Sequence, residues 1–174
     1  MPQNARSSRP VGIVVNPVSG RDVRRLAARA GTSTPEDKRN QVQRILVGAA
    51  AAGAERVVLV RDPFRIADSA VEALGVDIEV EMLELGTRCH PRDTPAAAKA
   101  MRERNCGVLV VLGGDGTNRQ IAKQWPDAPL VPISTGTNNV FPDPVEATMA
   151  GAAAGLVASG RIPIEAVSCR AKVV

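Results

Sequence analysis

Aromatic side chains are scarce in this chain of 174 residues, which has two phenylalanines, one tryptophan and no tyrosine. Three scattered rings make no platform on which successive bases could stack, so we predict no nucleic-acid partner. The hydrophobic core must instead be built from Val, Ile, Leu and Ala. Hydrophobic residues still make up 44% of the chain and charged residues 23%, a balance typical of globular proteins that excludes wholesale disorder.

Long apolar runs and cysteines are also scarce. The uncharged run from Ala147 to Gly160 has 14 residues, whereas a membrane-spanning helix needs about 18, so we expect no membrane span. Cys89, Cys106 and Cys169 lie far apart, with neither a metal-ligand spacing nor a disulfide framework. The first ten residues lack the apolar core of a signal peptide. We therefore expect a cytoplasmic location.

The net charge of +4 is unevenly distributed along the chain. Residues 1–44 hold nine basic and three acidic groups, residues 45–87 hold three and eight, and residues 88–123 hold seven and three. An anionic ligand held between the first and third segments would suit this pattern, and so would solvated helix faces. Charge alone leaves both interpretations open.

Short apolar runs alternate with helical patterns along the chain. Continuous runs rich in Val, Ile and Leu predict buried strands, and an alternating run predicts a half-exposed edge strand. The predicted strands are residues 11–15, 57–60, 108–112 and 130–133, with 78–83 at an edge; the predicted helices are 35–49, 66–74, 95–104, 118–124 and 145–159. The alternation predicts an α/β fold, a Rossmann-like three-layer sandwich with a mostly parallel sheet in the strand order 3-2-1-4-5.

The pattern divides the chain into three parts. Residues 1–10 are predicted to form a flexible N-terminal tail, and residues 11–161 an α/β nucleotide-binding domain. The apolar run 162–167 is typical of a new strand, so residues 162–174 are predicted to begin a truncated or missing C-terminal β domain. Exposed strands there would favour pairing between copies as a homo-oligomer. Gly151 and Gly155 are expected to let their helix lie close to the sheet.

The strongest chemical signal is Gly113-Gly114-Asp115-Gly116-Thr117, between a predicted buried strand and a predicted helix. The glycines let the backbone turn sharply and approach a ligand, and the following helix offers unpaired N–H groups to a phosphate. Phosphate repels a carboxylate, unless Asp115 binds a bridging Mg²⁺ or takes a proton from a substrate hydroxyl. A tight turn with Asp115 as the helix cap explains the same residues equally well.

Two further loops rich in small polar residues follow predicted strands: NPVSG at residues 16–20 and STGTNN at residues 134–139. Each one alone fits an ordinary turn. In a doubly wound sheet, however, ligands bind beyond the carboxyl ends of the strands, where the strand order reverses. With the order 3-2-1-4-5, the three loops would meet in one crevice between the two basic segments.

GGDGT before a helix, with NPVSG upstream and GTNN downstream, resembles the superfamily that joins NAD kinases with diacylglycerol and sphingosine lipid kinases. Within it, GGDGTNRQIAK, GTNNVFP and ATMAGAAAGLVASG are most similar to the ATP-NAD kinase / AcoX-like family. The resemblance covers residues 11–161. It implies an N-terminal α/β domain and a C-terminal β-sandwich domain, with ATP and the substrate bound between them.

The resemblance also implies roles for individual residues. Asp115 would be the catalytic base that accepts the proton of the attacking hydroxyl, and ATP with Mg²⁺ would be the cofactors. The ligands would be held by small residues of the three loops: Gly113, Gly114, Gly116 and Thr117 at the phosphates, Asn16, Ser19 and Gly20 on the other side of the ATP site, and Gly136, Thr137 and Asn138 around nucleotide or substrate.

The leading hypothesis is an ATP-dependent phosphotransferase domain that phosphorylates a hydroxyl of a soluble small molecule, with NAD as the first guess. Lipid kinases of the superfamily usually carry one apolar residue and then Asn-Glu after GGDGT. Here Asn118 follows directly and no Glu comes after it, which counts against a lipid substrate. A lipid (diacylglycerol-type) kinase domain and a non-catalytic nucleotide-binding module are the alternatives.

Two further groups are candidates for ligand contacts. His90 stands beside Cys89, but adjacent side chains point apart and no third metal ligand is near, so His90 is interpreted as a polar loop residue. Arg21, Arg24, Arg25 and Arg29 recur at helical spacing after NPVSG. Most of them are interpreted as a solvated face, with Arg21 as the best candidate for a phosphate contact.

Overall fold

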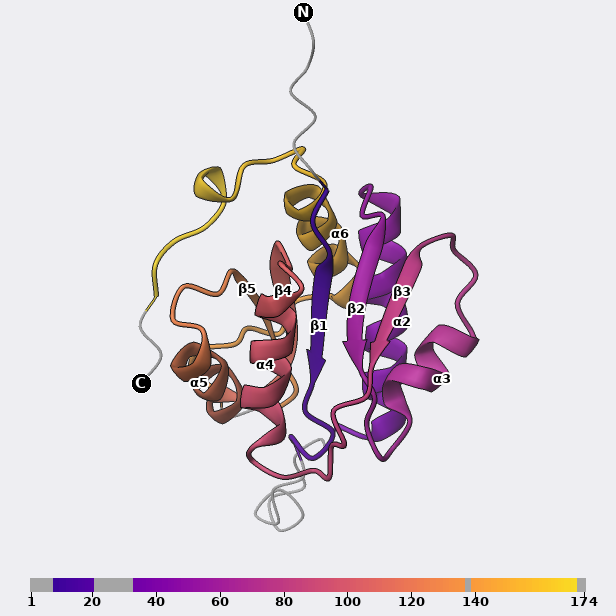
Figure 1. The fold of residues 1–174 in the computed structure, drawn as a ribbon, viewed down its shortest axis with the longest axis vertical. Helices are drawn as coiled ribbons and strands as arrows, with labels where there is room; N and C mark the ends of the chain where they lie inside the picture. Colours follow the sequence, from indigo (N-terminus) through magenta and orange to yellow (C-terminus); the bar gives the residue numbers. More distant parts are fainter. Residues whose placement is uncertain (1–7, 21–32, 137–138, 172–174) are drawn as a thin grey trace, which may run out of the picture.

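The computed structural model describes residues 8–20, 33–136 and 139–171, and Figure 1 shows how their elements are arranged. Within these residues, five parallel strands form one sheet in the order β3-β2-β1-β4-β5. The strands are β1 (Val11–Val15), β2 (Arg56–Val60), β3 (Glu79–Leu83), β4 (Val108–Gly113) and β5 (Leu130–Ser134). The predicted α/β class and strand order are confirmed.

Helices cover both faces of the sheet, which gives the predicted three layers (Figure 1). On one face lie α4 (Asp93–Glu103) and α5 (Asp115–Gln124). On the other lie α2 (Pro35–Ala51), α3 (Ile66–Glu72) and α6 (Ala147–Ala158). Among the described residues, no helix has the length and apolar character needed to cross a membrane.

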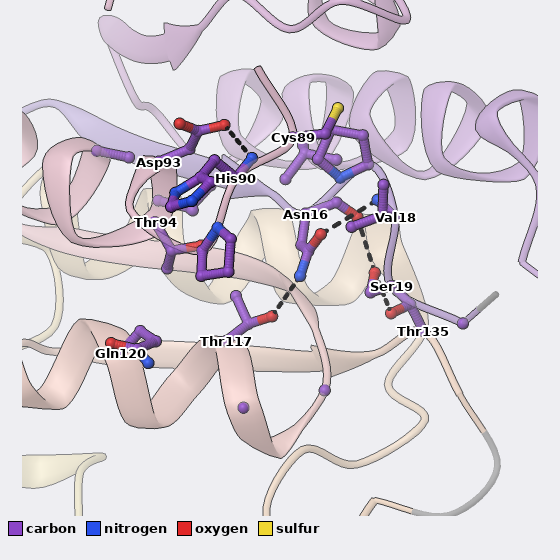
Figure 2. Close-up of a pocket in the computed structure, with 18 of the residues that line it drawn as sticks. Asn16, Val18, Ser19, Cys89, His90, Asp93, Thr94, Thr117, Gln120 and Thr135 are labelled. Atoms are coloured by element: carbon purple, nitrogen blue, oxygen red, sulfur yellow. Dashed lines mark hydrogen bonds between the residues drawn. The ribbon is translucent and has the colours of Figure 1, made fainter. Parts of the chain in front are cut away.

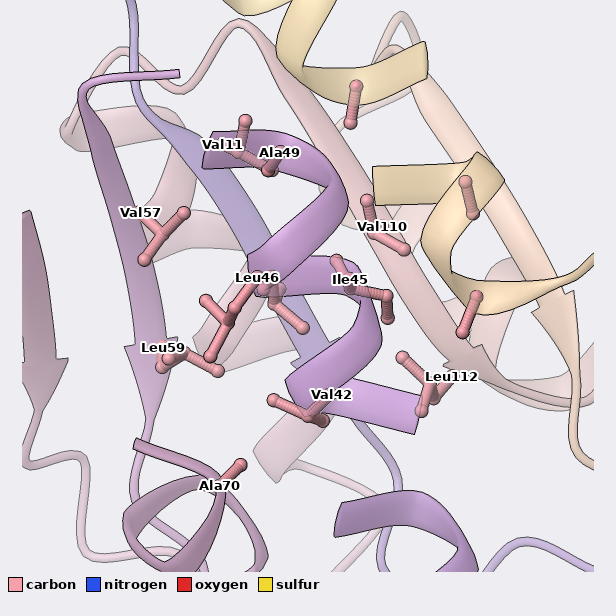
Figure 3. Close-up of a cluster of buried hydrophobic side chains, with 14 of the residues drawn as sticks. Val11, Val42, Ile45, Leu46, Ala49, Val57, Leu59, Ala70, Val110 and Leu112 are labelled. Carbon is pink, nitrogen blue, oxygen red and sulfur yellow. The ribbon is translucent and has the colours of Figure 1, made fainter. Parts of the chain in front are cut away.

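The core is divided by the sheet into two clusters. Side chains alternate along β4, so that Val110 and Leu112 pack with the α2 side while Leu109 and Val111 pack with the α4 side. Figure 3 shows the first cluster, where Ile45 of α2 lies among strand residues. Because β4 is buried on both faces, it is apolar at every position rather than at alternate ones.

Helix α2 begins at a capping box formed by Thr34 and Asp37. The Thr34 hydroxyl accepts a hydrogen bond from the Asp37 amide at 3.1 Å, and the Asp37 carboxylate accepts one from the Thr34 amide at 2.9 Å. The Thr34 amide, and after it the Thr34 hydroxyl at 2.8 Å, donate to the Asp37 carboxylate and lower the pKa of this carboxyl below its usual value. Pro35 follows at the first helical position, where a missing N–H costs nothing.

The prediction of a new strand at residues 162–167 is wrong. Ile164–Ala166 forms a 3₁₀ turn instead, in which the Ala166 amide donates to the Pro163 carbonyl at 3.0 Å. Pro163 begins the turn because its ring fixes φ. The proposed tail lies mostly outside the described residues, and the further β domain stays a prediction.

The expectation for Gly151 and Gly155 also needs correction, because these residues face α2 rather than the sheet. A Cβ added to Gly151 would collide with the Ile45 carbonyl oxygen, and one added to Gly155 would collide with that of Ala49. The two helices therefore touch backbone to backbone through their small residues, and α6 lies beside α2 on the same face of the sheet.

Gly151→Ala is expected to lower the free energy of unfolding by about 2 kcal/mol, because α6 must move off α2 to make room for the methyl group. Gly75→Ala is the matched control, since a Cβ there meets nothing within 4 Å. Urea denaturation of both variants measures the difference. Equal midpoints for the two would contradict the close packing of α2 on α6.

Candidate functional site

A cavity of about 480 Å³ opens at the carboxyl edge of the sheet. Residues from the loops after all five strands line it, including Asn16, Pro63, His90, Asp115 and Thr135. Figure 2 shows side chains of the loops after β1, β3 and β5 gathered around the opening, beside α5. The sequence predicted convergence of three of the loops; the loops after β2 and β3 also contribute.

Asn16 joins the first loop to helix α5. It comes directly after β1, and its backbone N–H continues the sheet by donating to the Leu112 carbonyl at 2.9 Å. Its side-chain Nδ2 donates to the Thr117 hydroxyl at 2.9 Å, while its Oδ1 accepts from the Val18 amide at 3.1 Å (Figure 2). The predicted NPVSG and GGDGT motifs are therefore in direct contact, across 101 residues of sequence.

Ser19 makes the corresponding connection to the loop after β5. The Thr135 hydroxyl donates to Ser19 Oγ at 2.8 Å, and Ser19 Oγ donates to the Asn16 carbonyl at 2.8 Å. Gly20 has φ of +78°, and a Cβ there would strike the Thr135 carbonyl oxygen, so both conformation and space require glycine. The loops after β1 and β5 thus form one hydrogen-bonded wall.

Lys38 stabilises the loop after β1 through its side-chain ammonium. It lies in the first turns of α2 and is fully buried. Its ammonium donates to the carbonyls of Pro17 and Ser19, both at 2.8 Å. A charge buried in this way needs close polar partners, and these two carbonyls of the cavity wall are among them. Sequence reasoning missed this residue, because a lysine in a charged first turn is typical of an exposed helix face.

The GGDGT segment forms the turn into α5, which begins three residues earlier than predicted. A Cβ on Gly113 would lie 2.6 Å from Thr117 Cβ, so the turn is tight. The Thr117 and Asn118 amides bond to the Gly114 carbonyl at 3.1 and 3.2 Å. The amides of Asp115 and Gly116 are then the donors that an anion at this helix end would meet.

The buried side chain of Asn118 stabilises that turn. It is fully buried, and its Nδ2 donates to the Gly114 carbonyl at 3.0 Å. The same carbonyl therefore accepts from both the backbone and the side chain of Asn118. The asparagine that departs from the lipid-kinase pattern thus has a structural role here.

The structure contradicts the interpretation of Asp115 as a cap of its own helix. The N-cap residue is Gly114, without a side-chain cap bond. The Asp115 carboxylate instead accepts from two amides of the β5–α6 loop: Val140 N lies 3.1 Å from Oδ1 and 3.0 Å from Oδ2, and Phe141 N lies 2.9 Å from Oδ1. Asp115 is half-buried and lines the cavity.

The loop after β3 brings a histidine to the cavity, although the sequence indicated only a polar loop. Asp93 organises this loop, because its Oδ2 accepts from the amides of Arg88 and His90, both at 2.9 Å. His90 Nδ1 accepts from the Arg92 amide at 3.2 Å. Cys89 has φ of +59° and also lines the cavity. A signal was present in the sequence, since this loop also follows a strand.

The loop after β2 is organised by a second carboxylate. Asp62 accepts hydrogen bonds from the amides of Phe64, Ile66 and Ala67 at 2.9 to 3.2 Å. Burial raises the pKa of the Asp62 carboxyl, and the same amide bonds oppose that rise. These contacts fix Pro63 at the cavity wall.

Several predicted contacts lie outside the described residues: Thr137, Asn138, Arg21, Arg24, Arg25 and Arg29. Their placement stays a prediction, while Gly136 does line the cavity. Within the described part of the chain, no three His, Cys, Asp or Glu side chains gather as a metal site would require.

Comparison with known proteins places the chain in a family. The sequence model described as ATP-NAD kinase N-terminal domain matches residues 11–162. Acetoin catabolism protein X of Cupriavidus necator is 38% identical over 160 residues, which cover 88% of this chain and 45% of that protein. An uncharacterized protein of Archaeoglobus fulgidus is 35% identical over 133 residues, which cover 76% of this chain and 36% of that protein.

No solved structure matches the chain. The chain spans less than half the length of the two curated relatives. The family match nevertheless covers all five strands and the loops that line the cavity. This chain belongs to the ATP-NAD kinase family, and residues 11–162 correspond to the N-terminal domain of that family.

Proposed function

We propose that this domain binds ATP in the cavity at the carboxyl edge of the sheet and takes part in phosphoryl transfer to a hydroxyl of a soluble small molecule, with NAD as the first candidate. One observation supports the proposal most: the start of α5, at Asp115 and Gly116, lines a cavity walled by the loops after β1 and β5. The family match agrees with it.

The phosphates would lie at the start of α5. Unpaired amides and the positive end of the helix dipole favour an anion there. Gly116 leaves open space above this turn, since an added Cβ would meet nothing within 4 Å. Asn16 and Ser19 would face the same phosphates from the first loop.

Mg²⁺ would arrive with the nucleotide rather than occupy a protein cage. Mg²⁺ commonly keeps several waters and binds through one or two carboxylates plus substrate phosphates. The described residues hold no cluster of metal ligands, which fits an ion held mainly by the phosphates and water, with Asp115 kept available for the acceptor. The ion would neutralise the charge that develops on the transferred group.

Asp115 would act on the acceptor. As general base, it would take the proton of the acceptor hydroxyl while that oxygen attacks the terminal phosphorus of ATP. The cavity extends from Asp115 to the loop after β3, which leaves space for a nucleotide beside the carboxylate. The acceptor itself stays a proposal.

Gly116→Glu is expected to weaken ATP binding at least about tenfold, because a carboxylate would then occupy the phosphate position. The fold should survive, since the site is open and an acidic residue favours a helix N-terminus. Calorimetric titration with MgATP measures the affinity.

Gly75→Glu is the matched control, because it adds the same charge at an open position away from the cavity. It should bind MgATP as the unaltered chain does. Equal MgATP affinities for the two variants would show that the phosphates do not bind at the start of α5. That result would contradict the proposed function.

A non-catalytic nucleotide-binding module is the second candidate. It is favoured by the amides of the β5–α6 loop that already occupy the Asp115 carboxylate. Tight MgATP binding without transfer to NAD or to any other hydroxyl acceptor, in the complete gene product, would support it over the kinase.

A further inference from the structure

The Asp115 carboxylate contacts the β5–α6 loop rather than its own helix. A carboxylate in the first turn of a helix ordinarily bonds to amides of that same helix. Asp115 bonds instead to the consecutive amides of Val140 and Phe141, 25 and 26 residues away. The position of this side chain is therefore set by a different loop.

That loop is anchored on both sides of the two amides. Before them, Asn139 Nδ2 donates to Ser134 Oγ at 2.8 Å. After them, the Asp143 carbonyl accepts from the Ser134 amide at 2.9 Å, beside a bridge between Ile133 and Asp143. The anchoring makes residues 139–141 a fixed support for the carboxylate.

The side chain of Val140 has no packing role that could explain this arrangement. Val140 is 93% exposed, although it is a large apolar residue. Asn139, next to it, lies against Gly114, where an added Cβ would come within 2.7 Å of its Oδ1. The backbone of this segment, rather than its side chains, is what meets Asp115.

The hydrogen bonds from the loop use some, but not all, of the acceptor positions of the Asp115 carboxylate. A carboxylate has about four acceptor positions on its two oxygens. Oδ1 accepts from both amides, whereas Oδ2 shares only the Val140 amide. One acceptor position of Oδ2 is then left over by these contacts.

We propose that the amides of Val140 and Phe141 are positioning groups that hold Asp115 with Oδ2 directed to the acceptor hydroxyl. This rests on the proposed function. The hydroxyl proton passes to Oδ2 while the acceptor oxygen bonds to the terminal phosphorus, and the bond from that phosphorus to the ADP oxygen breaks with its electrons leaving on ADP.

Val140→Pro removes one of the two donors and is expected to lower kcat roughly tenfold or more, with the KM for ATP changed by less than about twofold. Val140→Ala is the control: it keeps the amide and trims an exposed side chain, so its kcat should stay within about twofold of the unaltered protein. Both are measured in the complete gene product. A kcat for Val140→Pro equal to that of Val140→Ala would overturn the proposal.

Amide hydrogen exchange tests the contact without any activity, and it decides the matter where Val140→Pro fails to fold. Asp115→Ala should speed exchange at Val140 and Phe141 by roughly tenfold or more, because their acceptor is gone. The Ser134 amide, which bonds to Asp143, should keep its rate. Unchanged exchange at Val140 and Phe141 would overturn the proposal. If the unaltered protein transferred no phosphoryl group while exchange in Asp115→Ala still became faster, only the proposed function would be contradicted.

Discussion

Asp115→Asn is expected to lower phosphoryl transfer by about a thousandfold in the complete gene product, because an amide cannot accept the proton of the acceptor hydroxyl. The substitution keeps the size of the side chain, and its remaining oxygen can still accept from Val140 and Phe141. MgATP affinity and thermal stability should therefore change little. Steady-state kinetics with calorimetry separates the two effects.

Asp143→Asn is the control for that experiment. Asp143 is an exposed carboxylate on the same β5–α6 loop, and it contacts Ser134 through its backbone carbonyl. Its loss should leave turnover unchanged. Turnover by Asp115→Asn close to that of the unaltered protein would contradict the role of Asp115 as base.

Lys38→Met is expected to lower the free energy of unfolding by about 3 kcal/mol. It removes the hydrogen bonds that the ammonium donates to the carbonyls of Pro17 and Ser19. Because those carbonyls belong to the cavity wall, MgATP affinity should also fall, by roughly tenfold. Urea denaturation and calorimetry measure the two effects.

Lys99→Met is the matched control, since Lys99 is exposed on α4 and forms only a surface ion pair with Glu103 at 3.8 Å. Its loss should change the free energy of unfolding by less than about 0.5 kcal/mol. If Lys38→Met were no more destabilising than Lys99→Met, the first loop would not depend on the buried ammonium.

The arrangement of the sheet could be predicted because the strands carry local signals. Val11–Val15 and Val108–Gly113 are apolar at every position, and only strands covered on both faces tolerate that. Strand order then follows from the rules for parallel sheets, and it places the loops after β1, β4 and β5 at one edge. Much of the cavity wall follows from chain topology.

The remaining features depend on tertiary contacts that no local pattern carries. The ammonium of Lys38 contacts carbonyls of the first loop, about twenty residues away, and its sequence neighbours are charged, so no local pattern indicates its burial. The contacts of Asp115 with Val140 and Phe141 join groups 25 and 26 residues apart through backbone amides, which every residue type but proline offers. His90 reaches the cavity because Asp93 organises its loop.

The contact of α6 with α2 shows the same limit. The spacing of Gly151 and Gly155 indicates one small face of the helix, but it does not say what lies against that face. In the structure, helix α2 lies against that face. Gly48 of α2 also lacks a side chain, and a Cβ added there would collide with the Thr148 carbonyl oxygen. Complementary small residues on two helices are recognisable only once both are in place.

If ATP phosphates bind at the start of α5, an amide NMR titration of the 174-residue chain with MgATP should report binding there. The largest shift changes should fall on Asp115 and Gly116, while Gly53 and Gly107, at the opposite edge of the sheet, should not move. Changes centred on Gly53 and Gly107, with Asp115 and Gly116 still, would contradict the claim.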